Sequence, residues 1–137
     1  MHWATKYIGL PYLLGGVSAQ EGVDCWGLMR LVYQQEFGIA LPTIPGVTAA
    51  SAVAQHRAYV KELSRDWIRM ETPQEGAGVA MSQVGSLHHV GIWIAVDRGK
   101  ILHCWRQEGV VADTLRRLAL RGINSVFFYR HSLWPQS

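Results

Sequence analysis

The sequence predicts an α+β domain, because helical and strand-like patterns occupy different halves of the chain. Helical spacing of apolar residues is confined to the first half, whereas short apolar runs separated by turn residues dominate from about residue 77 onward. Strands that follow one another, without alternating helices, favour an antiparallel sheet. The 137 residues, 49% of them hydrophobic, suit a single domain spanning 1–137 with its own core.

The first long helix is expected directly after a Gly-rich loop at residues 12–23. Asp24 is a good N-cap, and apolar residues then recur at three-to-four spacing from Cys25 to about Phe37. Gly38 is expected to end this helix. The pattern therefore places a cysteine in the first turn of a helix.

Two further helical segments are expected in this half. Residues 2–9 could form a short helix, and an Ala-rich helix is expected from Thr48 to about Ser64. Either Thr48 or Ser51 can serve as the cap of the Ala-rich helix.

The second half is expected to form the sheet. A tight hairpin turn is expected at Arg98-Gly99, and residues 114–120 could add a short helical turn. The expected strands are 77–82, 89–96, 100–105, 109–113 and 125–130.

The composition and charge exclude several classes of function. The net charge is +3 without any block of Lys or Arg, and no aromatic-basic repeat is present, so we expect no nucleic-acid partner. No apolar run is long enough to span a membrane, and the first residues lack a signal-peptide pattern. The two cysteines, Cys25 and Cys104, are not expected to form a disulfide.

Cys25 is the candidate nucleophile. Unpaired backbone N–H groups and the dipole at a helix start favour a thiolate, so we expect the pKa of Cys25 to be lowered. The same N–H groups could hold the oxyanion that develops during acyl transfer. We expect the nearby glycines, Gly15, Gly16, Gly22 and Gly27, to leave space for a substrate to reach the sulfur.

A cysteine nucleophile needs a histidine base and a third polar group to orient it. His88, His89 and His103 are the candidates that fall in expected strands, whereas His56 is expected to be solvated. Neighbouring residues on a strand point to opposite faces, so only one of His88 and His89 can serve Cys25. The residues alone do not decide which.

The expected hairpin does not place His89 opposite His103. With the turn centred between Arg98 and Gly99, the two histidines lie at unequal distances from the centre, so a bulge, a longer loop or a third strand would be needed. A metal site formed by the strand histidines is disfavoured, because adjacent ligands would point apart and no carboxylate is expected nearby. We therefore expect no metal and no other cofactor.

These motifs together resemble the NlpC family of bacterial and phage cell-wall cysteine peptidases. The resemblance extends from about Ile8 to Tyr129. Its parts are Pro11-Tyr12 with Gly15-Gly16, Asp24-Cys25-x-Gly27-Leu28, His89-Val90-Gly91-Ile92, and Ile101-Leu102-His103 followed by Gly109-Val110-Val111.

The resemblance implies a papain-like fold, in which the helix bearing the nucleophile packs on an antiparallel sheet that carries the histidines. It implies that Cys25 is the nucleophile, that His89 rather than His88 is the base, and that His103 orients His89. Tyr12 is similar to the tyrosine that lines the site near the oxyanion. Asp24 and Trp26 are expected in the substrate site, and Trp26 departs from the serine that most relatives carry after the nucleophile.

The sequence around Asp24-Cys25-Trp26-Gly27, with its continuation to Pro42, is similar to the family members of tailed phages and gene-transfer particles. This implies a virion tail-tip enzyme that opens peptidoglycan stem peptides during entry, at the D-glutamyl–diamino acid bond typical of the family. It also implies tail-tip or hub proteins as partners and assembly in the bacterial cytoplasm, in agreement with the missing signal pattern.

Three alternatives remain open at this point. The domain could be a structural tail-tip subunit, and tryptophans outside obvious core positions, namely Trp3, Trp26, Trp105 and Trp134, would then suit docking. It could be a thiol amidase or acyltransferase with the same catalytic residues. It could also be an antibacterial toxin delivered between cells.

Overall fold

The computed structural model describes residues 2–44 and 51–134 as an α+β fold, which confirms the predicted class. The helical elements are the 3₁₀ helix η1 (Trp3–Lys6), α1 (Cys25–Val32), the π-helical turn η2 (Tyr33–Phe37), α2 (Ala52–Asp66) and α3 (Leu115–Leu120). The strands are β1 (Val17–Ser18), β2 (Gly22–Val23), β3 (Trp67–Met70), β4 (Gly78–Gln83), β5 (Ser86–Ile94), β6 (Lys100–Trp105), β7 (Gly109–Asp113) and β8 (Ser125–His131).

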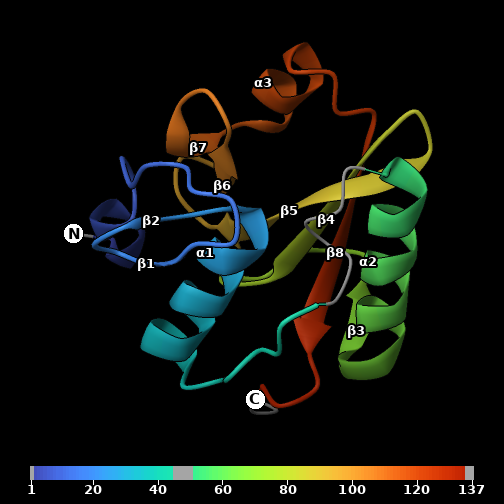
Figure 1. Ribbon diagram of the computed structural model, residues 1–137, viewed down its shortest axis with the longest axis horizontal. Helices are drawn as coiled ribbons and strands as arrows, with labels where there is room; N and C mark the ends of the chain where they lie inside the picture. Colours follow the sequence, from blue (N-terminus) through green and yellow to red (C-terminus); the bar gives the residue numbers. More distant parts are fainter. Residues whose placement is uncertain (1, 45–50, 135–137) are drawn as a thin grey trace.

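The main sheet has six antiparallel strands in the order β3-β8-β4-β5-β6-β7, and β1 and β2 form a separate small hairpin. Helix α1 contacts β5 and β6, and α2 contacts β5 and β3 (Figure 1). The outer strand β7 is covered by the N-terminal segment, since the Val110 N–H donates to the Leu10 carbonyl and the Gly9 N–H donates to the Val110 carbonyl. This contact brings the N-terminal loop beside the strands that carry the histidines.

Helix α1 begins where the sequence predicts. Asp24 is its N-cap and accepts a hydrogen bond from the Gly27 N–H at 2.7 Å. The α-helix ends at Val32 and continues as the π-helical turn η2, which Gly38 terminates in the left-handed conformation (φ 67°). The expected helix to Phe37 is therefore present, with its last turn widened.

The second helix and the strand that follows it differ from the expectation. Helix α2 is capped by Ser51 and runs to Asp66, whereas Thr48 lies outside the described residues. The short strand β3 was not expected from the sequence; it pairs with β8 through Trp67 opposite His131. The short helical turn expected at 114–120 is α3.

Gly16, Gly22 and Gly27 allow close packing of the backbone, so the expectation that these three open a path to the sulfur is wrong. A Cβ at Gly15, by contrast, would have no described neighbour within 4 Å. A Cβ atom at Gly27 would lie 1.8 Å from the Gly16 carbonyl oxygen, and one at Gly16 would lie 2.4 Å from the Gly22 carbonyl oxygen. A Cβ at Gly22 would in turn lie 2.7 Å from the Pro11 carbonyl oxygen. The loop thus lies directly against the start of α1 and fixes its position.

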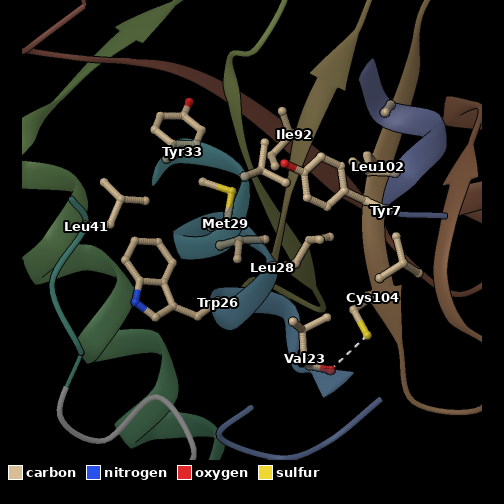
Figure 2. Close-up of a cluster of buried hydrophobic side chains, with 14 of the residues drawn as sticks. Tyr7, Val23, Trp26, Leu28, Met29, Tyr33, Leu41, Ile92, Leu102 and Cys104 are labelled. Carbon is tan, nitrogen blue, oxygen red and sulfur yellow. Dashed lines mark hydrogen bonds between the residues drawn. The ribbon is translucent and has the colours of Figure 1, made fainter. Parts of the chain in front are cut away.

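The main core lies between α1, α2 and the sheet (Figure 2). Leu28, Met29 and Tyr33 of the first helix pack there with Ile92 and Leu102 of the sheet. Cys104 is also buried there, and its thiol donates a hydrogen bond to the Val23 carbonyl at 3.2 Å, drawn as a dashed line in Figure 2. A smaller cluster on β4 and β6 packs with Leu118 and Ile123; it consists of Val79, Met81, Ile101, Leu118 and Ile123.

Most tryptophans proposed for docking belong to the core or pack on it. Trp26 is only 5% exposed, and its indole N–H donates to the Pro42 carbonyl at 2.9 Å. Trp3 and Trp134 are half-buried and contact Phe37 edge-on, and Trp134 also stacks on Tyr33. These contacts remove the main support for a docking role of these side chains.

Among the described residues, no helix combines the length and the apolar composition that crossing a membrane requires.

Candidate active site

A cleft of about 650 Å³ contains the predicted site residues and draws its walls from distant parts of the chain. The N-terminal loop contributes Tyr12, the start of α1 contributes Cys25, and α2 contributes Tyr59. The sheet contributes His89, and the turn between β6 and β7 contributes Arg106. The cleft therefore forms only when the two helices pack on the sheet.

Cys25 is half-buried in this cleft and is the first residue of α1. Its sulfur lies 3.3 Å from the Tyr59 hydroxyl, within hydrogen-bond distance. Tyr59 comes from the middle of α2 and is 2% exposed. Burial and the neighbouring thiol raise the pKa of Tyr59 well above its usual value, so this hydroxyl keeps its proton and can donate it to the sulfur.

The environment of Cys25 favours the neutral thiol, contrary to the expectation from its place at a helix start. Burial raises the pKa of Cys25. Hydrogen bonds from the Tyr59 hydroxyl and from the backbone N–H groups of Val90 and Trp26 lower this pKa, but they offset burial only in part. The two cysteines are both free thiols, as expected.

His89, His103 and Asp113 form a continuous chain of hydrogen bonds. His89 Nε2 lies 2.9 Å from His103 Nδ1, and His103 Nε2 lies 2.7 Å from Asp113 Oδ2. All three side chains are buried, with exposed fractions of 7%, 0% and 7%. This series of hydrogen bonds ends at the His89 ring, whose other nitrogen, Nδ1, takes part in neither bond.

The carboxylate at the end of the chain determines where the protons lie. Ionised Asp113 is only an acceptor, so His103 Nε2 must carry a proton and donate it. With neutral rings, His103 Nδ1 then accepts, His89 Nε2 donates, and His89 Nδ1 is left as an acceptor. The single carboxylate therefore sets both rings in the tautomers in which His89 can receive a proton.

The pKa shifts agree with these protonation states. Burial lowers the pKa of His89 well below its usual value, and electrostatic interactions with His103, His88 and Arg121 lower it further. Burial raises the pKa of Asp113, but hydrogen bonds from His103 and Arg121 outweigh it, so that the net shift is downward. Asp113 is therefore ionised and His89 neutral near pH 7.

Arg121, at the C-terminal cap of α3, holds Asp113 from the outer side. Its Nε donates to Asp113 Oδ2 at 2.7 Å, and its Nη2 donates to Glu108 Oε2 at 2.5 Å. The guanidinium also lies 5.2 Å from the centre of the Trp105 ring. The carboxylate is thus fixed between a histidine and an arginine.

The register of β5 and β6 explains how His89 reaches His103. Ile94 pairs with Lys100, so the turn spans residues 95–99 and is centred on Asp97 rather than between Arg98 and Gly99. This longer loop brings the two histidines to diagonal positions on the strand pair, where ring-to-ring contact is possible.

Gly91 leaves the space that this diagonal contact needs. A Cβ at Gly91 would lie 2.8 Å from the Leu102 carbonyl oxygen and 3.0 Å from the Cβ of His103. Any side chain there would push β6 and the His103 ring away from His89.

His88 and His89 both line the cleft, which contradicts the expectation that they point to opposite faces. Met81 of β4 pairs with His89 and Ser82 pairs with Leu87, so His88 is the extra residue of a β-bulge. Bulges re-aim side chains in this way and are frequent near active sites. Only His89 is hydrogen-bonded to His103, and the buried Nδ1 of His88 has no partner among the described residues.

The remaining predicted site residues, Tyr12, Asp24 and Trp26, all line the cleft. The carboxylate of Asp24 is fully engaged by the backbone, since Oδ1 accepts from the Gly27 N–H and Oδ2 accepts from the Gly15 N–H, each at 2.7 Å. Its observed role is therefore to cap α1 and to join the loop to it.

Two site residues were missed from the sequence. Asp113 lies at the end of an expected strand, and the prediction that no carboxylate is near the histidines is wrong. The sequence carried a signal for Asp113, because the expected strands 100–105 and 109–113 are joined by a short turn. In the structure this turn pairs Ile101 with Asp113, which places the carboxylate diagonally from His103. Tyr59 had no such signal, and His56, expected to be solvated, instead accepts a hydrogen bond from the Leu87 N–H and ties α2 to β5.

Within residues 2–44 and 51–134, no group of three or more His, Cys, Asp or Glu side chains comes close enough to hold a metal ion.

A thiol at a helix start, in one cleft with a histidine chain on an antiparallel sheet, is the arrangement of the papain-like class. The chain belongs to the NlpC/P60 family, whose model matches residues 9–122. The fold is similar to the crystal structure of the NlpC/p60 domain of the peptidoglycan hydrolase SagA. The TM-score is 0.60 at 25% identity, over 92% of this chain and 90% of that one.

Curated relatives carry hydrolase and endopeptidase names. A probable endopeptidase of Haemophilus influenzae is 29% identical over 110 residues, 80% of this chain and 60% of the relative. The Escherichia coli K12 murein DD-endopeptidase MepS/murein LD-carboxypeptidase is 26% identical over 78% of this chain and 48% of the relative. A gamma-DL-glutamyl hydrolase of Bacillus subtilis is 56% identical over 39 residues, 28% of this chain and 9% of the relative. The chain thus spans at most 60% of the length of these relatives.

Proposed function

We propose that the chain is a cysteine peptidase that hydrolyses peptidoglycan stem peptides. The observation that carries this proposal is the hydrogen-bonded chain His89–His103–Asp113, which ends in the same cleft as Cys25. Cys25 is the nucleophile, His89 the general base and His103 the residue that orients it. The peptidoglycan and murein names of the relatives support the substrate class.

The proton moves only when the substrate is attacked. Since the pKa of Cys25 is raised and that of His89 is lowered, the resting pair is a neutral thiol and a neutral imidazole. On attack, His89 Nδ1 takes the thiol proton while the sulfur bonds to the carbonyl carbon. The C–N bond then breaks, His89 returns the proton to the leaving amine, and a thioester remains on Cys25. Water, deprotonated by His89, hydrolyses the thioester and regenerates the thiol.

The oxyanion of the intermediate is placed at the start of α1. Backbone N–H groups of Cys25 and Trp26 lie at the first turn of this helix, where partial positive charge gathers. Tyr12 faces the same cleft from the N-terminal loop, and its hydroxyl is the candidate side-chain donor to the oxyanion, in addition to the backbone N–H groups. Trp26, beside the nucleophile, shapes the accepted peptide.

We further infer that the bond cut is the D-glutamyl–diamino acid amide. The local similarity to a gamma-DL-glutamyl hydrolase supports an isopeptide bond through the glutamyl side chain.

The biological setting we propose is the tail tip of a phage or related particle, with tail or hub proteins as partners. This setting rests on the Asp24–Gly27 motif and its continuation to Pro42. Mass spectrometry of particles induced from the host strain tests it, and particles that lack the chain would contradict it.

The enzymatic proposal is tested by digestion of purified peptidoglycan and of a synthetic stem peptide. Products are identified by mass spectrometry for the wild type, Cys25→Ala and the control Cys104→Ser. The control replaces the other thiol, which donates to the Val23 carbonyl, by a hydroxyl that can do the same. Cleavage by the wild type and the control but not by Cys25→Ala is expected. Equal cleavage by Cys25→Ala would rule out this nucleophile.

A further inference from the structure

The cleft contains a cation whose charge nothing in the described part of the chain balances. Arg106 is the only lysine or arginine that lines the cleft among the described residues, and Asp24 is the only acid there. Both oxygens of Asp24 accept backbone N–H groups of α1 and the N-terminal loop. Asp24 therefore has little capacity left to pair with a guanidinium.

The nearest acid along the chain from Arg106 is committed elsewhere. Glu108 accepts from Arg121 at 2.5 Å, and the same arginine holds Asp113. The ion pairs found within the described residues involve Arg65, Arg121 and Lys side chains, together with histidines, but not Arg106. The contrast between Arg121, with two carboxylates, and Arg106, with none, marks Arg106 as the cation available to a ligand.

Arg106 is exposed at the cleft and lies beside an aromatic ring. Its guanidinium lies 5.5 Å from the centre of the Tyr12 ring. Tyr12 forms an isolated bridge with Val23, two residues before Cys25. Arg106 itself follows β6, the strand that carries His103. The cation thus lies between the two chain segments that supply the reactive groups, and no hydrogen bond or ion pair to its guanidinium is found within residues 2–44 and 51–134.

We infer that Arg106 binds a free carboxylate of the substrate, so that the enzyme selects acidic peptides. This inference rests on the proposed function. A guanidinium offers a planar fork of donors that matches a carboxylate. A glutamyl residue linked through its side-chain carbonyl keeps its α-carboxylate, and a diamino acid on the amine side carries a carboxylate as well. The chemistry recognised is the same for both.

The test uses three soluble stem peptides, namely the parent, one amidated at the glutamyl α-carboxylate and one amidated at the diamino-acid carboxylate. The values of kcat/KM are measured for the wild type, Arg106→Gln and Arg106→Lys. Arg116→Gln, on exposed α3 outside the cleft, is the control with the same change in net charge.

We expect Arg106→Gln to lower kcat/KM for the parent by about tenfold, mainly through KM, with a smaller loss for Arg106→Lys. The peptide that lacks the contacted carboxylate should be a poorer wild-type substrate and should be insensitive to Arg106→Gln. The insensitive peptide identifies which carboxylate is bound. The gap between wild type and Arg106→Gln should narrow as ionic strength rises.

An equal loss on all three peptides, or no loss on any, would overturn the carboxylate assignment while leaving the peptidase intact. If the wild type cleaves none of the peptides, the proposed function fails first. Binding of the same peptides to Cys25→Ala, measured by calorimetry with and without the Arg106→Gln change, then decides the assignment separately. An absence of binding, or binding that amidation does not weaken, would overturn it.

Discussion

The two sides of the cleft are held in very different ways. On the side of the cleft formed by the strands, His89, His103, Asp113 and Arg121 form one unbroken chain of hydrogen bonds of 2.7–2.9 Å, buried between His89 and Asp113 and part-buried at Arg121. On the helix side, Cys25 is half-buried; the Tyr59 hydroxyl, 3.3 Å from its sulfur, is its one side-chain partner among the described residues, beside the backbone N–H groups of Val90 and Trp26.

Under the proposed mechanism, this difference indicates which group has to be preorganised. An imidazole base works only in one tautomer and one orientation, so the fold supports it with several partners. A thiol must leave its resting contact and bond to the substrate, so a strong fixed partner would hinder it. The strand side is therefore expected to be sensitive to small changes, and the helix side tolerant of them.

The largest effect is expected for the base itself. His89→Gln retains a polar side chain but cannot take up the thiol proton, so kcat/KM should fall by about 10²–10⁴-fold. The measurement is steady-state cleavage of a stem peptide, with circular dichroism to confirm folding. The matched control is His88→Gln, on the neighbouring bulge residue, which should lose far less. Comparable losses in the two variants would break the assignment of His89 over His88.

Asp113→Asn should lower kcat by about tenfold or more, because an amide can donate to His103 and reverse both tautomers. His89 Nδ1 would then carry a proton and could not accept one from Cys25. NMR of the imidazole nitrogens should show the change in tautomer, which a purely structural effect would not produce. Unchanged nitrogen shifts together with unchanged kcat would show that Asp113 does not set the tautomers.

Acid should destabilise the fold in two steps. Burial lowers the pKa of His89 below its unfolded value of about 6.5. As the pH falls below that value, His89 binds a proton in the unfolded chain but not in the folded one, which favours unfolding. The free energy of unfolding should fall by up to about 1.4 kcal/mol per pH unit for this proton. The lowered pKa of Asp113 adds a second loss below about pH 4.

Urea unfolding at pH 7.5, 6, 5, 4 and 3 measures these losses, and the interval below pH 4 reports the step of Asp113. Burial also lowers the pKa of His131, so the wild type should lose stability from both histidines in the first step. His89→Gln should remove only the loss of stability caused by His89. The losses caused by His131 and by Asp113 should remain. An identical pH dependence in the wild type and His89→Gln would contradict the buried neutral imidazole.

Tyr59→Phe should have the smallest effect. It removes the hydroxyl that lowers the pKa of Cys25, so the pKa should rise further and alkylation by iodoacetamide should shift to higher pH. We expect kcat/KM to fall by only a few-fold, about 1 kcal/mol for one neutral hydrogen bond. A large loss of kcat would mean that the helix side is as constrained as the strand side.

Local sequence signals predicted much of the frame of the site. Asp24 before an apolar helical pattern placed Cys25 at a helix start, and Gly38 ended that helical segment. The strand-like runs of the second half became β4 to β8, with small shifts of their ends. These features depend on neighbours within a few residues, which is why a sequence pattern can predict them.

Three features of the site were decided only by the tertiary structure. The turn centred on Asp97 sets the diagonal register of His89 and His103, and a shift of one residue would have separated them. Packing of α2 on β5 brings Tyr59 to the sulfur of Cys25 across 34 residues of sequence.

The direction of the Cys25 pKa shift is the third of these features. The helix start alone predicts a lower pKa, yet burial by the surrounding elements raises it. Desolvation depends on every group that surrounds the sulfur, and those groups come from the loop, two helices and the sheet. The sequence by itself therefore determined which residues could react. The packing of distant segments decided their protonation state in the absence of substrate.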